Sequence, residues 1–355
     1  MRGSQRTPWR KLLRNKAAVG GMVFIALCIL MAIFAYFISP DSSPNANRII
    51  VEIGGQKPGH VQQFFKLRKP VVADQSFANR LIHGKKEIFD FIPIVSYTRK
   101  PDSLIIYKFI DEALSERVAY ANHQIPGAEL SSMHFLLGTD KYGRDIVSRL
   151  MVGVRVSLGV GIVTVLLSVI IGVFLGAVAG YFKGWADDLI MWFINVVWSI
   201  PTLLLVFAVT LVLGKGFWQV FIAIGLTTWV NVARLIRGQV LGIRQLEYIE
   251  AARALGFSSS RIIIRHILPN VTGPVIVIAA SNFATAIVIE AGLSFLGVGV
   301  QPPQPSWGLM IKENYNFIIT HNAMLALAPG FAIMLLVLAF NVVGNGLRDA
   351  LQVKE

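Results

Sequence analysis

The sequence predicts an all-α membrane protein with about six transmembrane helices. Of its 355 residues, 54% are hydrophobic and only 15% are charged, whereas a soluble domain of this size carries nearer to a quarter charged residues. The apolar residues also gather in blocks that approach the roughly 20 residues a helix needs to cross a bilayer. Helices are favoured in lipid because each backbone polar group must be paired within the segment.

The first predicted span covers residues 17–39. Residues 1–16 before it carry six Lys and Arg residues and no acidic residue, which favours a cytoplasmic N-terminus. The span is longer than the core of a signal peptide and no convincing cleavage site follows it, so we expect it to be retained. Five further blocks of span length or close to it lie at residues 156–180, 189–213, 217–232, 271–300 and 323–343, the block from 217 being the weakest.

The charges between these blocks agree with six spans and two cytoplasmic termini. Residues 233–270 are rich in arginine and fall on the cytoplasmic side, whereas residues 214–216 and 301–322 fall outside and carry few cations. We therefore attribute the formal net charge of +13 to a positive-inside bias rather than to nucleic-acid binding.

Residues 40–133 do not fit a minimal helical bundle. They are polar, mixed in charge, and contain short β-favouring stretches at residues 49–53 and 103–110. The six-span topology places them outside, and loops this long escape the positive-inside count. We expect a small extracytoplasmic insertion, whose fold the pattern leaves open.

Two local features concern the packing of the spans. Gly172, Gly176 and Gly180 recur at four-residue intervals, a pattern that lets helices approach closely in a bilayer. Pro201 in the third span predicts a kink, because proline cannot donate a helical hydrogen bond.

The predicted cytoplasmic segment contains the most informative motif. Residues 246–255 favour a helix, Gly256 suits a left-handed cap, and the serines at 258–260 can cap a second helix that Pro269 would end or kink. We expect a short helix, a tight turn and another short helix. The small Ala251 and Ala252 would let a partner surface approach closely; an ordinary linker is the alternative interpretation.

This motif resembles the EAA loop of ABC importer permeases, whose helices dock in a groove of the ATPase subunit. The resemblance rests on Glu250-Ala251-Ala252, Gly256 and Leu268-Pro269, while His266 stands where the pattern expects an apolar residue. It implies an ATPase-coupling loop that comprises Glu250, Ala251, Ala252, Arg253, Gly256, Leu268 and Pro269.

Flanking stretches narrow the resemblance to the C-type permease subunits of dipeptide and oligopeptide ABC importers. Residues 134–150, residues 290–308 and the C-terminal residues 341–351 look like that family, whereas residues 17–39 resemble it loosely and residues 40–133 not at all. The third span departs from the family, which often has Arg and Asp where this chain has Trp192 and Asn195. That departure weakens any transfer of a polar role to those positions.

The resemblance implies a domain order and a set of partners. We expect a cytoplasmic N-terminus and first span (1–39), the insertion (40–133), an interfacial segment (134–153), a type I ABC transmembrane core (154–346, with the coupling loop at 233–270) and a cytoplasmic tail (347–355). The implied location is the cell inner membrane. The implied partners are a homologous permease subunit, two ABC ATPase subunits, an extracytoplasmic substrate-binding protein and membrane lipid. Peptides would be carried inward by alternating access without chemical change, so no enzymatic activity is expected.

Two sets of polar residues are further candidate sites. Asp140 and Arg144, like Asp145 and Arg149, are four residues apart and could pair on an interfacial helix capped by Thr139. Direct substrate contact is the alternative. Since surface ion pairs are worth only tenths of a kcal/mol to about 1, we favour a structural role.

Glu290 forms the second set with Asn282. A carboxylate inside an apolar span costs on the order of 2.5–3.5 kcal/mol and usually faces a bundle interior or an aqueous path. A buried hydrogen bond, to Asn282 or to a partner subunit, is the structural alternative. In an ATP-independent secondary carrier or channel, the rival function, Glu290 would be the ion-coupling group.

Several motifs are absent from the sequence. It has no G-x-x-x-x-G-K-[ST] phosphate loop, so the ATPase must be another chain, and no H-E-x-x-H or G-x-S-x-G pattern supports an intramembrane enzyme. Cys28 is the single cysteine, which excludes a disulfide framework and a cysteine-based metal site. We predict no cofactor and no metal.

Overall fold

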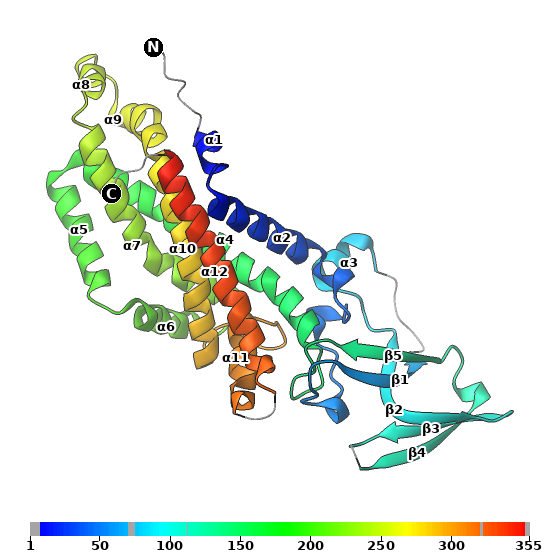
Figure 1. Cartoon of the computed structure of the whole chain (residues 1–355). Helices are drawn as coiled ribbons and strands as arrows, with labels where there is room; N and C mark the ends of the chain where they lie inside the picture. The colour runs from blue at the N-terminus through cyan, green and yellow to red at the C-terminus, as the bar shows by residue number, and fades with distance from the viewer. Residues whose placement is uncertain (1–7, 70–74, 112, 320–321, 352–355) are drawn as a thin grey trace. The chain divides into compact units, whose positions relative to one another are not determined.

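The computed structural model describes residues 8–69, 75–111, 113–319 and 322–351 (Figure 1). The first seven residues of the predicted cytoplasmic N-terminus and the last four of the predicted tail lie outside these ranges. The chain divides into two compact units. The helical unit comprises residues 1–28, 157–301 and 333–355, and the sheet unit comprises residues 29–156 and 302–332.

Helices make up the first unit, and three of them, α2, α4 and α12, run on into the second. In chain order the helices are α1 (Pro8–Leu12), α2 (Lys16–Ile38), α4 (Ile146–Phe182), α5 (Gly184–Trp198), α6 (Thr202–Leu213), α7 (Phe217–Ile243), α8 (Glu247–Ala254), α9 (Ser259–Ile262), a π-helix (Ile263–Ile267), α10 (Leu268–Leu296) and α12 (Met324–Leu351). By length and composition, five described helices could span a membrane, or six if the bent pair α5 and α6 forms one span. This agrees with the predicted six.

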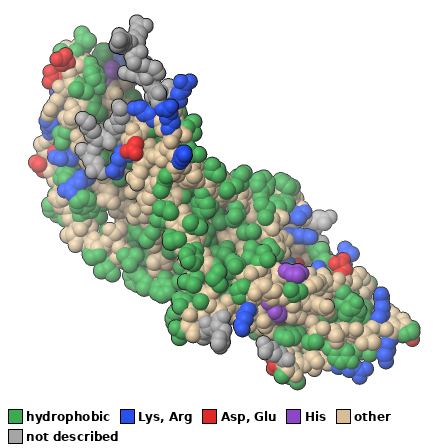
Figure 2. Space-filling model, in the orientation of Figure 1, with side chains coloured by type: hydrophobic (Ala, Val, Ile, Leu, Met, Phe, Trp, Pro, Cys, Tyr) green, Lys and Arg blue, Asp and Glu red, His purple; other side chains and the backbone are tan. Residues whose placement is uncertain are grey.

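Apolar side chains cover the visible face of the helices, and Lys and Arg gather toward the end that carries α1, α8 and α9 (Figure 2).

The third span is bent as predicted, and the fourth is longer than predicted. Helices α5 and α6 meet at 94°, which confirms the kink expected at Pro201. Pro201 lies at that break; it lacks an N–H and restricts the residue before it, so the helix stops there. The fourth span was predicted to end at residue 232, yet α7 continues to Ile243, because Ala233, Ile236 and Val240 recur at helical spacing and are buried.

Glycines on α4 allow α7 to pack closely, as predicted. A Cβ at Gly172 would lie 2.5 Å from Val232 Cβ, and one at Gly180 would lie 2.8 Å from Val240 Cβ. A Cβ at Gly176 would collide with the carbonyl oxygen of Ala233. Any side chain at these three positions would force the helices apart.

The sheet unit shows that the all-α prediction holds only for the membrane helices. Its five antiparallel strands have the order β4-β3-β2-β1-β5. They are β1 (His60–Arg68), β2 (Phe89–Arg99), β3 (Ser103–Phe109), β4 (Ser115–Ala121) and β5 (Glu129–Phe135). The unit also contains α3 (Phe77–His83) and α11 (Trp307–Asn314), with short 3₁₀ turns at Pro44–Ala46, Val51–Ile53, Asn122–Gln124 and Tyr315–Ile318.

Alternating side chains give the sheet an apolar cluster on each face. Phe64 packs with Ile50 and Ile53 on one face, while Phe65 packs with Ile106 on the other. The predicted strand tendency at 103–110 is confirmed as β3. The prediction at 49–53 is wrong, because the Ile50 N–H donates to the Tyr142 carbonyl and the segment closes into a 3₁₀ turn.

Candidate functional site

The segment with the EAA-like motif forms two short helices joined by a glycine turn. We call residues 247–267, which contain α8, α9 and the π-helix, the short-helix segment. Gly256 has φ +76°, which confirms the predicted left-handed cap. The Gly256 N–H donates to the Arg253 carbonyl (3.0 Å) and the Phe257 N–H donates to the Ala252 carbonyl (3.1 Å), the pair of bonds of a Schellman motif.

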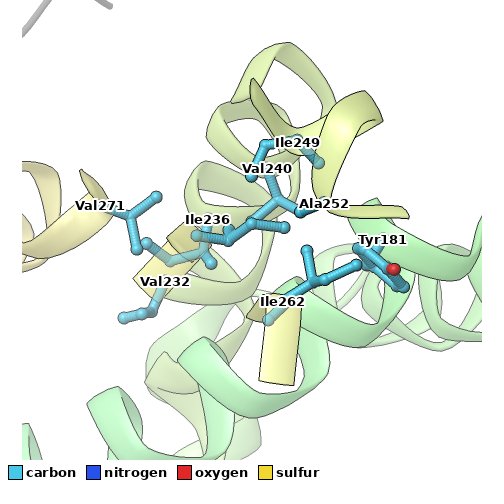
Figure 3. Close-up of a cluster of buried hydrophobic side chains, with 10 residues drawn as sticks. Tyr181, Val232, Ile236, Val240, Ile249, Ala252, Ile262 and Val271 are labelled. Atoms are coloured by element: carbon cyan, nitrogen blue, oxygen red, sulfur yellow. The ribbon is translucent and has the colours of Figure 1, made fainter. Parts of the chain in front are cut away.

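A buried cluster fastens this segment to the long helices. Figure 3 shows Ile249 and Ala252 of α8 gathered with Ile262 of α9, Val240 of α7 and Tyr181 of α4. Ile249 and Ile262 are fully buried. Because side chains three apart share one face of a helix, Ala252 turns inward with Ile249. The expectation that Ala252 faces a partner is therefore wrong, and its small size serves internal packing.

The opposite face of α8 and the turn after it are exposed. Glu250, Ala251, Arg253 and Gly256 all lie there. So does Leu255, whose side chain is 74% exposed and which the sequence reasoning missed. Its signal was present, because Leu255 follows Ala251 by four residues and so shares its face. The turn thus presents one large apolar side chain inside a charged rim.

Pro269 does not end the second short helix. Ser259–Leu296 is one continuous 38-residue helix. The π-helix accommodates the proline, because the Leu268 N–H donates to the Ile263 carbonyl five residues back and Pro269 follows in the first turn of α10. Leu268 is half-buried beside it. Ser258 occupies the predicted N-cap position but makes no capping side-chain bond.

The two residues of the predicted intramembrane polar site are not partners. Glu290 and Asn282 are both buried on α10, but eight residues separate them by about 12 Å along the axis. Asn282 donates to the Ser168 hydroxyl of α4 (3.4 Å). Glu290 Oε1 accepts the hydroxyl of Ser294 (2.6 Å), and Ser294 Oγ accepts the Val300 N–H (3.0 Å). The carboxylate therefore holds the chain that leaves α10.

Residues 136–145 of the predicted interfacial segment form a loop where a helix was expected, and its last eight residues begin α4. One of the predicted ion pairs is present. Arg144 Nε lies 2.6 Å from Asp140 Oδ2, and Arg144 Nη2 lies 2.8 Å from Glu313 Oε2 on α11. The predicted pair of Asp145 with Arg149 is wrong, because Asp145 accepts the Ser148 N–H (2.8 Å) and caps α4. Burial raises the pKa of the Asp145 carboxyl, although the bonds from Ser148 oppose this.

The ion pair of Asp140 and Arg144 is buried, which favours the structural role over substrate contact. Asp140 and Arg144 are 0% and 3% exposed, which leaves substrate little access. Glu313 was missed, since it lies 169 residues from Arg144 and no local pattern connects them. The predicted cap at Thr139 is also wrong, because its hydroxyl donates to the Ile53 carbonyl (2.5 Å). Within the described ranges, no group of three or more His, Cys, Asp or Glu side chains could hold a metal ion.

Comparison with known proteins decides the family. Residues 172–354 match the family described as binding-protein-dependent transport system inner membrane component. The chain belongs to this family. Residues 5–53 match the N-terminal transmembrane domain of oligopeptide transport permease C, so the resemblance inferred from the motifs is confirmed. The match includes residues 40–53, where no resemblance was expected.

Relatives share most of their length with this permease. It is 44% identical over 224 residues to the glutathione transport system permease protein GsiD of Pectobacterium atrosepticum (63% of this chain, 74% of the relative). It is 44% identical over 217 residues to the dipeptide transport system permease protein DppC of Alkalihalophilus pseudofirmus (61% and 71%). It is 38% identical over 252 residues to the oligopeptide transport system permease protein OppC of Bacillus subtilis (71% and 82%). The chain is accordingly a permease subunit of an ABC importer.

Helix α5 of this permease differs from the family pattern in a consistent way. Trp192 and Asn195, which replace the often charged positions, are both exposed. The charged pair of this region is instead Asp187 with Arg237 of α7, joined by two bonds of 2.6 and 2.7 Å. The bidentate pair links α5 to α7.

Proposed function

We propose that this permease carries peptides inward and that its short-helix segment is the docking site for the ATPase subunits. The observation that supports this is the contrast between the two faces of α8. Ile249 and Ala252 attach one face firmly to the long helices, whereas Glu250, Ala251 and Leu255 leave the other face open to a partner. A docking element needs both properties, because a force applied to the open face must reach the spans.

The substrate class follows from the relatives. Their names give glutathione, dipeptides and oligopeptides as cargo, all of which contain peptide-type amide bonds. The proposed partners are a homologous permease subunit, two ABC ATPase subunits and an extracytoplasmic binding protein. ATP binding would close the ATPase pair, the short-helix segment would follow it, and the spans would reorient around the substrate path.

The proposed orientation places the short-helix segment in the cytoplasm and the sheet unit's insertion, residues 40–133, outside. In the Cys28→Ser background, single cysteines would be introduced by Ser259→Cys and Gln75→Cys. A thiol reagent that cannot cross the inner membrane should label only the Gln75 variant in intact cells. Labelling of the Ser259 variant in intact cells would contradict this topology.

Purification of the tagged chain from gently solubilised membranes of its own host tests the assembly. We expect two ABC ATPase subunits and a second permease to copurify, and labelled dipeptide uptake to depend on ATP. A chain that purifies without an ATPase, with uptake driven by an ion gradient, would instead support a secondary carrier. Glu290 offers little to that alternative, since it is 1% exposed and bonded to Ser294.

A further inference from the structure

A cavity of about 330 Å³ lies beside the break between α5 and α6, entirely within the helical unit. The ends of α5 and α6 form one wall, and α7 and α10 form the other. Irregular backbone at membrane depth is tolerated where it is buried in protein or lines an aqueous cavity. The volume is near the lower limit of known ligand pockets, roughly 300–1,000 Å³, and so suits part of a ligand rather than a long one.

Three threonines of this cavity offer hydrogen-bond acceptors. The hydroxyls of Thr227 and Thr228 each donate to the Ile224 carbonyl (2.9 Å), and that of Thr285 donates to the Ser281 carbonyl (3.0 Å). Each hydroxyl has one proton, which is thereby used, so the remaining lone pairs can only accept. The cavity wall therefore favours a ligand that donates N–H groups.

Asn231 supplies the complementary group. Its Oδ1 accepts the Trp198 indole N–H (3.0 Å), so Nδ2 is the atom that can donate to a ligand. The Arg234 guanidinium lies over the Trp198 ring, 4.0 Å from its centroid. The indole is thus held by two neighbours and forms a fixed edge of the cavity.

The remaining lining is apolar apart from Thr202, with Leu203 on α6 and Ile289 on α10. Hydroxyl acceptors, an amide donor and apolar side chains together match one residue of an extended peptide: its amide N–H, its carbonyl and an apolar side chain.

We propose that this cavity is a transport subsite that holds one apolar residue of the peptide cargo by its amide group and its side chain. The inference rests on the proposed peptide function. It means that the permease, in addition to the binding protein, selects substrates that have backbone N–H groups. The threonine oxygens accept the peptide N–H, and Asn231 Nδ2 donates to the carbonyl.

The test uses Thr228→Val in the complete transporter and compares uptake of labelled Ala-Phe with that of its analogue methylated on the peptide nitrogen. Valine keeps the shape of threonine but removes the acceptor. Thr210→Val is the matched control, because Thr210 is equally buried and bonds the carbonyl four residues back, yet it does not line the cavity. Basal ATP hydrolysis and the amount of the chain in the membrane are measured for each variant.

We expect Thr228→Val to slow Ala-Phe uptake about five-fold, the effect of one lost hydrogen bond, and to leave uptake of the methylated peptide unchanged. Thr285→Val should act in the same direction, and Thr210→Val should behave as wild type. Equal effects of Thr228→Val on both peptides, or wild-type uptake by both cavity variants, would overturn the subsite while the peptide function stands. If the wild-type transporter carries neither peptide, the proposed function fails and the subsite with it.

Discussion

Two helix ends in the helical unit share one backbone motif but have opposite surroundings. A glycine in the left-handed conformation follows each helix, Gly256 after α8 and Gly297 after α10, with φ +76° and +84°. At both ends, the N–H groups of the glycine and of the residue after it donate to carbonyls in the last turn of the helix. The Gly297 N–H donates to the Ser294 carbonyl and the Val298 N–H donates to the Leu293 carbonyl.

The difference lies in what surrounds each turn. Apart from its neighbours in the chain, no heavy atom lies within 4 Å of a Cβ added at Gly256, whereas the turn after α10 is bonded through Ser294 to Glu290 and Val300. The motif specifies only how the backbone leaves the helix. Its neighbours decide whether the turn is open to a partner or fixed in place, and substitutions should separate these two cases.

The largest effect is expected at Gly299, in the fixed turn. A Cβ there would collide with the backbone nitrogen of Ser294, which cannot rotate away as a side chain could. Gly299→Ala should therefore lower the free energy of unfolding by about 3 kcal/mol, at the upper end of overpacking costs. Thermal unfolding in detergent measures this. Gly238→Ala is the control, because open space surrounds that position; equal melting temperatures for both variants would contradict the fixed turn.

Replacement of Glu290 tests the same turn through its side chain. Glu290→Leu removes the acceptor of the Ser294 hydroxyl and should cost about 1–3 kcal/mol, whereas Glu290→Gln keeps an acceptor and should cost less. Membrane insertion should be normal in both. Uptake and melting temperature are measured for both variants. A Leu variant that matches wild type in both would show that the carboxylate does not stabilise the turn after α10.

The open turn should respond to backbone conformation alone. Gly256→Val should cost about 1 kcal/mol or more, because a β-branched residue resists positive φ, and should weaken ATPase copurification and substrate-stimulated ATP hydrolysis. Gly256→Asn is the matched control, since asparagine tolerates this conformation. Full ATPase binding by the Val variant would make the segment a linker.

The smallest effect on the chain's own stability is expected at Glu250. Its side chain is exposed, so Glu250→Lys should change the free energy of unfolding by no more than about 0.5 kcal/mol. At a docking surface, however, charge reversal can cost several kcal/mol, and Glu250→Gln should harm ATPase binding less. Titration of the ATPase at low and high salt distinguishes the two variants. Equal affinity of both at low salt would remove Glu250 from the contact.

Features that depend on neighbouring residues were predicted well from the sequence, whereas contacts between distant segments were not. Gly256 was predicted because a helix end with a left-handed residue is encoded within a few positions. The burial of Ala252 could have been inferred from its spacing to Ile249, but the motif drew attention to a partner instead. The contact of Arg144 with Glu313 and the pairing order of the five strands depend on segments far apart in the chain, which periodicity cannot match.

The π-helix has a mechanical consequence. Since it lets Ser259–Leu296 continue past Pro269 as one helix, the proposed docking end and the end that carries Glu290 belong to a single helix about 57 Å long. A tilt of one degree about one end displaces the other by about 1 Å, using that helical rise. Thr285 lies about 39 Å along this helix from Ser259, so an ATPase that tilted the helix by about three degrees about its α9 end would move the Thr285 wall of the cavity by about 2 Å.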